Sequence, residues 1–581
     1  MSKNYPTTEQ KSIIEFDADM LVTAVPGSGK TKTIIDKVEK LAKIVSNKNI
    51  VVITYTYRAA DEVSDRLSNR NIENEHVWSG TIHKFCLEYI INPNLNLIPD
   101  LCKGYDIVDE DDVDKITRHC AETLGITLRF NDPINLSLDI NGSLEEADDT
   151  KKKVAIAVYK HLRENKLISF DQILYYAYRV LVSNKYVAKN IAHGAEWIII
   201  DEYQDTKELQ YQIISQIALA SKNVKLMFVG DPNQAIYTNL GGVVKNKIEL
   251  DEMMDREFSV KHLTGCFRSA QRIIDFYNVF ACEHEDINSN ISNYPNPYVK
   301  YFAEVAVEPE QFGIFAKRYI DEFYNNGMEY SDICVALPWG LHLIHLSSWF
   351  LKNAPNIPID SPIITPLKKM DDGIWNNLIR PIFVVFNYKN VFYYERMLRV
   401  SLKEIEIRFG VRCKDNLDDL LDYYSKISLD DHAIATQIIE TEAEKIFSDI
   451  IGLSVEIYKP YIDFLLDATK SKIQRYSAQL NDTVECFKQC YKSKNGVVFS
   501  TFHGCKGEEY RGVIVGGLNE GYVPHSSRLA FRDESKRLLF VVMSRAKEKL
   551  VLSSRPMATV GRGNPYPVNN EVANCKFDFD E

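Results

Sequence analysis

The sequence predicts an α/β protein with two parallel-sheet domains, each interrupted by a mostly helical insertion. Short apolar runs that end in polar signatures recur along the 581 residues, as in "DMLVTAVPGSGKT" at 19–31 and "EWIIIDEYQD" at 196–205. Such runs are typical of strands buried on both faces, with a loop at the carboxyl end. Helical patterns such as "ELQYQIISQIALA" follow several of the runs. This alternation indicates parallel sheets with functional loops at the strand ends.

The other predicted strands fall into two groups along the chain. They are "NIVVITYT" from residue 49, "VKLMFVG" from 224, "DICVAL" from 332, "GVVFST" from 496 and "RGVIVGG" from 511. Two long stretches break the pattern and are mostly helical, so each resembles an insertion into an α/β domain. The expected first domain comprises residues 1–84 and 190–262, with 85–189 as its insertion. The expected second domain comprises 263–360 and 481–581, with a reduced insertion at 361–480.

Length, composition and charge limit the class of protein. With 45% hydrophobic and 26% charged residues, the chain fits a soluble globular protein of roughly two to four domains. No apolar stretch approaches the roughly 18 residues of a membrane span, so no membrane association is expected. The net charge of −12 argues against blanket nucleic-acid binding but allows a local groove. Only Cys486 and Cys490 are closely spaced, without a second pair to complete a metal site, which fits a reduced cytoplasmic compartment.

The stretch "AVPGSGKT" at 24–31 carries the strongest chemical signal, because it follows an apolar strand and opens a helical pattern. Glycines in such a loop let backbone N–H groups approach phosphates that the helix N-terminus also attracts. The lysine would bridge the outer phosphates, and the hydroxyl that follows it would ligate Mg²⁺. The predicted phosphate-site residues are Gly27, Ser28, Gly29, Lys30 and Thr31.

The acidic pair Asp201–Glu202 ends the run "WIIIDE". Carboxylates are costly to bury without a partner. Beside the loop at Lys30, Asp201 would hold the Mg²⁺ that Thr31 also touches, and Glu202 would activate the attacking water. A second carboxylate implies a general base, and therefore turnover of a nucleoside triphosphate rather than simple binding.

Ten motifs together resemble those of the UvrD/Rep-type superfamily 1 DNA helicases. They run in family order from residue 9 to residue 550, so the resemblance covers most of the chain outside the insertions. The motifs are "EQ", "AVPGSGKT", "ITYTYRAADEV", "GTIHKF", "ISFDQIL", "IIIDEYQDT", "VGDPNQAIY", "LTGCFRS", "STFHGCKGEEYRGVIV" and "RLLFVVMSRAKEKL". The resemblance implies two RecA-like domains, ATP as substrate and movement on DNA.

The resemblance also assigns residues around ATP. Gln10 would read the adenine edge, Phe267 would stack on the base, and Lys32 would lie over its other face. Gln234 would touch the γ-phosphate, and Glu509 would contact the ribose. From the second α/β domain, two arginines would reach the γ-phosphate and stabilise charge during transfer. They are Arg268 in "CFRS" and Arg545 in "MSRA".

A second set of residues would lie along single-stranded DNA. Their hydroxyls and N–H groups could hold phosphates, and their aromatic rings could stack on bases without reading sequence. The alternative for the tyrosines is an ordinary place in the core near strand ends. This predicted set comprises Thr54, Tyr55, Thr56, Thr81, His83, Tyr237, Thr501 and His503. The expected DNA partner is a single strand or a tailed duplex, and the "QAIY" form resembles the 3′-to-5′ branch of the superfamily.

The chain departs from the family after "QAIY". Asn239 and Leu240 stand where a tryptophan and an arginine are usual, so one stacking platform and one charge are missing. This departure keeps a second hypothesis open, a DNA-sensing or signalling ATPase subunit with little unwinding of its own. Such a subunit is similar to the helicase-like chain of the Gabija anti-phage system, which partners a nuclease. The departure therefore leaves both DNA repair and antiviral defence open as biological roles.

Overall fold

A computed structural model describes most of the chain. The described residues are 6–44, 47–54, 63, 66, 70, 76–108, 110–128, 134–237, 241–284, 286–291, 294–360, 366–367, 374–384, 391–413, 416–475, 477, 480–491, 495–523, 532–556, 558–559 and 565–581. Contacts divide the chain into two compact units. Unit 1 comprises Met1–Ser269 with Ala281–Asn293, and unit 2 comprises Ala270–Phe280 with Tyr294–Glu581. None of the described helices has the length and apolarity of a membrane span.

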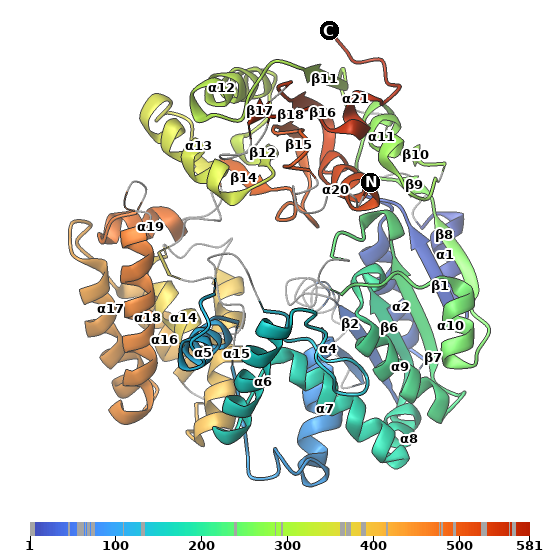
Figure 1. Ribbon diagram of the computed structural model, residues 1–581, viewed down its shortest axis with the longest axis vertical. Helices are drawn as coiled ribbons and strands as arrows, with labels where there is room; N and C mark the ends of the chain where they lie inside the picture. Colours follow the sequence, from blue (N-terminus) through green and yellow to red (C-terminus); the bar gives the residue numbers. More distant parts are fainter. Residues whose placement is uncertain are drawn as a thin grey trace. The chain divides into compact units, whose positions relative to one another are not determined.

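Unit 1 is built on a six-stranded, all-parallel sheet with strand order β3-β2-β6-β7-β1-β8 (Figure 1). Its strands are β1 (Met20–Ala24), β2 (Asn49–Thr54), β3 (Val77–Thr81), β6 (Ala195–Asp201), β7 (Lys225–Gly230) and β8 (Ser259–Leu263). The helices that directly follow or precede these strands are α1 (Thr8–Glu15), α2 (Lys30–Ala42), α8 (Lys185–Gly194), α9 (Glu208–Ala220) and α10 (Lys247–Met254). Short 3₁₀ turns at Tyr203–Asp205 and Pro232–Gln234 follow β6 and β7.

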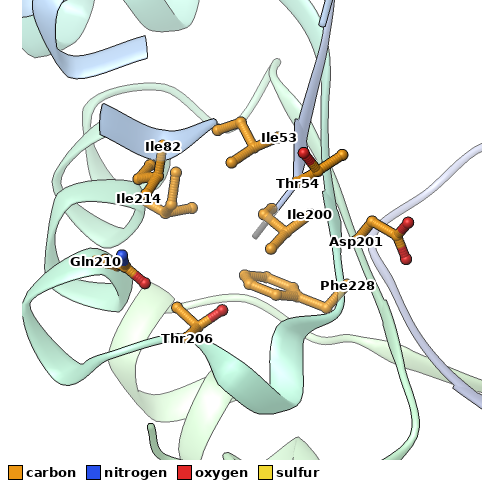
Figure 2. A pocket seen from close by; sticks show the side chains of 9 residues that line it. All are labelled: Ile53, Thr54, Ile82, Ile200, Asp201, Thr206, Gln210, Ile214 and Phe228. Carbon is orange, nitrogen blue, oxygen red and sulfur yellow. The ribbon is translucent and has the colours of Figure 1, made fainter. Parts of the chain in front are cut away.

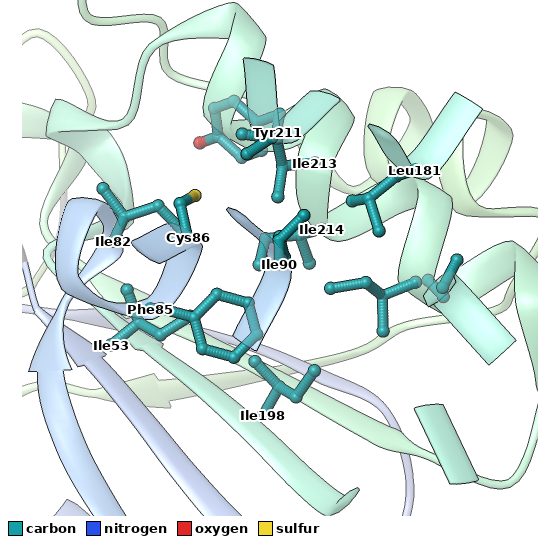
Figure 3. Packing of buried hydrophobic residues seen from close by; sticks show 14 of the residues in the cluster. Ile53, Ile82, Phe85, Cys86, Ile90, Leu181, Ile198, Tyr211, Ile213 and Ile214 are labelled. Carbon is teal, nitrogen blue, oxygen red and sulfur yellow. The ribbon is translucent and has the colours of Figure 1, made fainter. Parts of the chain in front are cut away.

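The sheet of unit 1 is buried on both faces, as its continuous apolar runs predict. Along β6, Trp197 and Ile199 pack with α1 and α2, whereas Ile198 and Ile200 pack on the opposite face. Successive side chains of a strand point to opposite faces, so a run without polar residues requires cover on each side. Figure 3 shows the second face, where Ile198 lies among side chains of the helices that follow β3 and of α9.

The helical segment between β3 and β6 has two parts. One part shares the core of the sheet and consists of α4 (Ile82–Phe85), a π-helical continuation (Cys86–Ile91), a 3₁₀ turn (Asn92–Leu97) and α7 (Phe170–Ser183). The other part has a small core of its own and consists of α5 (Glu110–Thr123) and α6 (Asp149–Glu164). A two-stranded ladder of β4 (Asp106–Ile107) and β5 (Leu167–Ile168) accompanies it. The predicted insertion 85–189 is thus only partly independent of the sheet.

Unit 2 repeats the architecture with a parallel sheet of order β11-β16-β15-β12-β14-β13. Its strands are β11 (Tyr298–Phe302), β12 (Ile333–Leu337), β13 (Ile359–Asp360), β14 (Val497–Thr501), β15 (Tyr510–Val515) and β16 (Ala546–Ser553). The accompanying helices are α11 (Gln271–Tyr277), α12 (Pro309–Asn325), α13 (Gly340–Asn353), α20 (Arg532–Met543) and α21 (Asn570–Ala573). Its 3₁₀ turns are Asn278–Phe280 and Tyr330–Asp332, and β17 (Ala558–Thr559) pairs with β18 (Pro565–Tyr566).

The helical segment between β13 and β14 forms its own apolar core. It comprises α14 (Ile374–Ile379), a 3₁₀ turn (Arg380–Phe383), α15 (Val391–Phe409), α16 (Asn416–Lys426), α17 (Ala435–Ala443), a π-helical turn (Glu444–Ile450), α18 (Val455–Arg475) and α19 (Val484–Tyr491). The predicted fold class is confirmed: two RecA-like parallel sheets alternate with helices, and largely helical segments interrupt both.

The contact division differs from the predicted domains in one region. Residues 263–269 and 281–293, which the sequence assigned to the second domain, belong to unit 1. The backbone explains why: Val25 N–H donates to Leu263 O at 3.0 Å, and Phe267 N–H donates to Gly27 O at 2.7 Å. A short parallel ladder of β9 (Gly265–Cys266) and β10 (Asn288–Ser289) joins the two segments. The predicted bounds of the insertions stay a prediction.

Candidate functional site

The loop between β1 and α2 has the backbone of a phosphate-binding turn. Gly27 and Gly29 adopt φ of +73° and +80°, a region that residues with a Cβ rarely adopt. A Cβ at Gly27 would also lie 2.5 Å from Arg268 Cβ. Gly29 is the N-cap of α2, and it makes no side-chain capping bond. The loop thus leads into a helix N-terminus, which attracts anions.

Lys30 opens α2 and meets the acidic end of β6. Its Nζ lies 2.5 Å from Glu202 Oε1 and 3.8 Å from Asp201 Oδ1. Burial opposes the charged ammonium, but the two carboxylates outweigh it, and the pKa of Lys30 is raised above its ordinary value. The sequence placed these three residues together from motifs about 170 positions apart, and the structure brings them into contact.

The backbone at the acidic pair is held in an uncommon conformation. Glu202 has φ +56° and ψ +43°, in the left-handed region. For a residue other than glycine this costs about 1–3 kcal/mol and is found mostly at functional sites. Asp201 is only 5% exposed, and its Oδ1 accepts the Glu202 N–H at 2.9 Å. The turn therefore aims two adjacent carboxylates in fixed directions at the end of one strand.

Thr31 and Asp201 are a donor set that suits Mg²⁺. A hydroxyl and a carboxylate are hard oxygen ligands, and Mg²⁺ in phosphate sites takes one or two such protein ligands beside phosphates and water. Asp201 ends β6, while Thr31 lies in the first turn of α2 next to Lys30. The predicted magnesium ligands are therefore chemically compatible with the ion.

Gln10 and the segment 263–268 both contact the phosphate loop. Gln10 is buried; its Nε2 donates to Ser28 O at 3.1 Å, and its Oε1 accepts the Thr7 N–H at 2.9 Å in a capping box of α1. The predicted adenine reader is thus fixed directly on the phosphate loop. Phe267 is half-buried, with its N–H on Gly27 O. Lys32 is half-buried in the first turn of α2, and burial lowers its pKa.

Arg268 lies close to the boundary between the two units. The sequence placed it in the second domain, but contacts assign it to unit 1, because its Cβ lies against Gly27 of the phosphate loop. Its predicted role toward the γ-phosphate stays a prediction, but as a residue of the same unit as the loop.

A chain of buried hydrogen bonds extends from the acidic pair to Gln234. Gln204 Nε2 donates to Glu202 Oε2 at 2.5 Å, and Gln204 Oε1 accepts the Asp231 N–H at 3.1 Å. Asp231 Oδ2 accepts from Gln234 Nε2 at 2.6 Å. Both turns follow neighbouring strands, β6 and β7, whose carboxyl ends meet at one edge of the sheet. The structure thus joins the predicted base and the predicted γ-phosphate contact through two residues that the sequence analysis did not assign, Gln204 and Asp231.

Gln204 and Asp231 stand in two of the predicted motifs, but their roles were not predicted from the sequence. The signal was a buried-strand pattern that continues into amide and carboxylate residues, "IIIDEYQD" and "FVGDPNQ". Buried polar side chains need partners. Two such groups at adjacent strand ends could therefore have been expected to bond to one another.

Two predicted ATP-site residues of unit 2 stand directly before strands, Glu509 before β15 and Arg545 before β16. Arg545 follows α20 and is 1% exposed; its Nε donates to Val541 O at 2.9 Å and one terminal nitrogen to Glu508 O at 3.3 Å. Glu509 is exposed and pairs with Lys547 at 2.8 Å. Their predicted contacts with ATP stay predictions.

The predicted DNA residues divide by burial. Thr54 and Thr81 are buried, and Thr81 Oγ1 caps α4 by accepting the Lys84 N–H at 3.3 Å; their predicted contacts with DNA stay predictions. Tyr237 is half-buried in unit 1. In unit 2, Thr501 and His503 are half-buried around the end of β14. Tyr55 and Thr56, like Asn239 and Leu240, lie outside the described residues.

His83 is half-buried beside α7 and packs edge-on against Phe170, with ring centroids 5.4 Å apart. Burial, partly offset by Asp171 and reinforced by Lys207, lowers the pKa of His83 to about 4. Its imidazole is therefore neutral at physiological pH and can offer an N–H and a lone pair, but no charge.

A small cavity lies under the strand ends of unit 1 (Figure 2). Its volume of about 20 Å³ holds no more than a single water, so it is not a ligand site. Its lining is mostly apolar, and in Figure 2 the Asp201 carboxylate points away from that lining. The lining residues are Ile53, Thr54, Ile82, Ile200, Asp201, Thr206, Gln210, Ile214 and Phe228.

Comparison with known families agrees with the geometry. The model of the UvrD/REP helicase N-terminal domain matches residues 6–255, and that of the UvrD-like helicase C-terminal domain matches residues 417–556. The chain belongs to the UvrD/Rep-type superfamily 1 helicases. It is similar to the ATP-dependent DNA helicase PcrA of Bacillus subtilis, with 24% identity over 98% of this chain and 85% of the relative. A probable DNA helicase II homolog of Mycoplasma capricolum is 22% identical over 93% and 83%.

A further relative among these helicases has similar coverage. The ATP-dependent DNA helicase PcrA of Staphylococcus epidermidis is 22% identical over 95% of this chain and 83% of its own length. The two family models cover both the phosphate loop with its acidic pair and the segment that holds Arg545. Family membership therefore spans both units.

Proposed function

We propose that this chain is an ATP-dependent DNA helicase that translocates on single-stranded DNA in the 3′-to-5′ direction. The observation that carries the proposal is the contact of Lys30 with Glu202 and Asp201 at the carboxyl ends of β1 and β6. A phosphate loop alone binds nucleotide, whereas a second carboxylate beside it supplies a base for hydrolysis. Relatives named ATP-dependent DNA helicases support the same activity, and the direction rests on the resemblance of "QAIY".

Hydrolysis would proceed at the end of β6. Lys30 would leave Glu202 for the β- and γ-phosphates, and Glu202 would accept a proton from a water aligned with the γ-phosphorus. The water oxygen bonds to phosphorus while the bond to the β–γ bridging oxygen breaks, which leaves ADP and phosphate. Thr31 and Asp201 would hold Mg²⁺, which neutralises phosphate charge in this class of reaction. Arg268 and Arg545 would stabilise the charge that develops on the transferred group.

The DNA-facing set would convert this reaction into movement. Tyr237 and His83 in unit 1, with Thr501 and His503 in unit 2, offer stacking and hydrogen-bonding groups that tolerate any base. Sequence-independent contacts suit a motor that passes over every base in turn. Because Arg545 belongs to unit 2 and the phosphate loop to unit 1, the proposed hydrolysis would depend on residues of both units, which would link chemistry to motion.

The test is ATP hydrolysis by the purified chain, with and without single-stranded DNA, beside the variant Glu202→Gln. We expect DNA to stimulate the unmodified chain, and Glu202→Gln to bind ATP normally but lose turnover by about 10²–10⁴-fold, the usual contribution of a general base. A matched control is Glu196→Gln at the opposite end of β6, where the carboxylate pairs with Lys48 at 3.0 Å. An unchanged rate in Glu202→Gln would remove Glu202 as the base, and tailed duplexes would test the direction.

A second candidate function rests on the departure after "QAIY". Without the usual tryptophan and arginine, the chain would be a DNA-sensing ATPase in a nuclease-containing defence complex. Strand separation by the isolated chain distinguishes the two candidates. A helicase unwinds a tailed duplex alone, whereas the sensing subunit hydrolyses ATP on DNA and leaves the duplex intact.

A further inference from the structure

Gln204 is a buried glutamine close to the predicted base, and the predicted site does not include it. It lies in the turn Tyr203–Asp205 after β6, and its side chain is 0% exposed. Its two amide atoms have different partners: Nε2 donates to Glu202 Oε2 at 2.5 Å, and Oε1 accepts the Asp231 N–H at 3.1 Å. A buried amide with both ends bonded can take only one orientation.

The neighbouring strand is shaped to receive this amide. A Cβ at Gly230 would lie 2.1 Å from Gln204 Oε1 and 2.7 Å from a ring carbon of Tyr203. Glycine at the end of β7 thus allows the two turns to approach, and the Asp231 backbone then decides which side of the amide faces Glu202. The carboxylate of the same Asp231 accepts from Gln234 Nε2 at 2.6 Å.

The Glu202 carboxylate is held through both of its oxygens. Lys30 contacts Oε1, and the Gln204 amide donates to Oε2. If Lys30 moves to phosphate, as the proposed function requires, the Gln204 amide still orients the carboxylate. This matters because a general base works only within hydrogen-bond reach of the proton it accepts. The Glu202 backbone also adopts the left-handed region, which is unfavourable for a residue other than glycine.

We propose that Gln204 is a positioning residue for hydrolysis, which fixes the Glu202 carboxylate toward the attacking water and is itself oriented by the Asp231 backbone. The inference rests on the proposed function. It also gives the base a hydrogen-bonded connection, through Asp231, to Gln234. A change at the predicted γ-phosphate contact would then pass to the base through Asp231 and the Gln204 side chain.

The first test is the variant Gln204→Met, which keeps the length of the side chain and removes its hydrogen bonds to Glu202, Asp205 and Asp231. With saturating single-stranded DNA, we expect kcat to fall by about 10- to 100-fold, a part of the general-base contribution, while KM for ATP is unchanged.

Two further variants separate positioning from general packing. Gly230→Ala should displace Gln204 Oε1 and reproduce the loss of kcat with the side chain still present. Gln210→Met is the matched control: Gln210 is another buried glutamine of unit 1, whose Oε1 caps α9 by accepting the Lys207 N–H at 2.9 Å. It should lower thermal stability as much as Gln204→Met, with kcat unchanged.

The decisive comparison uses the Glu202→Gln background. If Gln204 acts through Glu202, adding Gln204→Met to Glu202→Gln should lower kcat no further, because residues that act as a unit are not additive. An equal further loss in that background, or an unaffected kcat in both Gln204→Met and Gly230→Ala, would overturn the inference alone. An unmodified chain without ATP hydrolysis would overturn the proposed function and this inference with it.

Discussion

The two sheets have the same architecture but different chemistry at their carboxyl ends. In unit 1, β1 runs into a glycine loop and α2 begins at Lys30, within reach of two carboxylates. In unit 2, β12 runs through Pro338 into α13, and Trp339 stacks on His342 with centroids 5.5 Å apart. Parallel α/β folds present strand ends at one edge, and the residues placed there decide what that edge can do.

The buried cations of the two units sharpen the contrast. Lys30 is held by carboxylates, which raise its pKa. Arg545 is held by the carbonyls of Val541 and Glu508 and by the Ser544 hydroxyl, groups that orient a guanidinium without neutralising it. Lys30 is thus positioned by charge, whereas these carbonyls and this hydroxyl orient the Arg545 guanidinium by hydrogen bonds. Unit 2 thus holds an arginine fixed by hydrogen bonds, and unit 1 holds a lysine beside two carboxylates.

The largest expected effect is the loss of Arg545. If it stabilises the transferred phosphoryl group, Arg545→Ala should lower DNA-stimulated kcat by about 10³–10⁵-fold, with little change in ATP affinity. Arg545→Lys should recover only a part, because a lysine cannot reproduce the fork of donors. Steady-state hydrolysis and nucleotide binding are measured together with thermal unfolding.

The control for Arg545 is Arg511→Ala in the same unit, which removes the ion pair of Arg511 with Glu548 at 2.9 Å. That variant should be less stable but catalyse normally. A loss of ATP affinity in Arg545→Ala without a loss of kcat would count against a transition-state role. Arg545 would then differ from Lys30 in its surroundings but not in its role, since both would serve to bind ATP.

A third buried cation, Lys37 in α2, predicts a pH effect on stability. It is 1% exposed, its Nζ donates to Ile13 O and Phe16 O at 3.2 and 2.7 Å, and it lies 4.3 Å from the Trp197 ring. Like Arg545, it is held by carbonyls, but burial lowers the pKa of this lysine from 10.5 to about 8. Carbonyl oxygens thus support the charge less well than the carboxylates beside Lys30.

The direction of this pH effect follows from the number of protons that Lys37 binds in the folded and unfolded chains. Between about pH 8 and pH 10.5 the unfolded chain binds more protons at Lys37 than the folded chain, so this group makes stability rise with pH in that window. The full effect is roughly 3 kcal/mol. Denaturant unfolding should show that the unmodified chain gains stability relative to Lys37→Met between about pH 7 and about pH 10. Lys40→Met in the same helix should show no such change, and an identical pH response of both variants would refute the assignment.

Most of both sheets could be predicted because their inner strands are continuous apolar runs. β1, β2, β6, β7, β12, β14 and β15 all coincide with quoted runs. The edge strands β3, β8, β11 and β13 were missed, since an edge strand carries polar residues on its open side. Strand β16 is internal, yet its sequence contains Glu548 and Lys549, which look exposed. Glu548 is buried only because Arg511 of β15 pairs with it, and a partner 37 residues away is invisible to local pattern.

The candidate site divides in the same way. Lys30, Asp201 and Glu202 were predictable because phosphate chemistry demands those residue types after strands. Gln204 and Asp231 were missed, because their importance lies in a contact between two turns that only the pairing of buried polar groups at neighbouring strand ends would have indicated. Nor could the sequence show that Arg268 packs on Gly27, which moves it from the second domain to unit 1.

The smallest expected effect concerns Tyr237, which tests whether unit 1 also holds DNA. Tyr237 lies three residues after Gln234, in a chain where the following tryptophan and arginine of the family are absent. If it stacks on a base, Tyr237→Ala should weaken single-strand binding by about 1–3 kcal/mol while DNA-free hydrolysis is nearly unchanged. Tyr186→Ala, on the 77% exposed tyrosine of α8, is the control in the same unit. Fluorescence titration with a labelled oligonucleotide measures both. Equal affinities for the two variants would return Tyr237 to the core, and DNA contacts would then have to come mainly from unit 2.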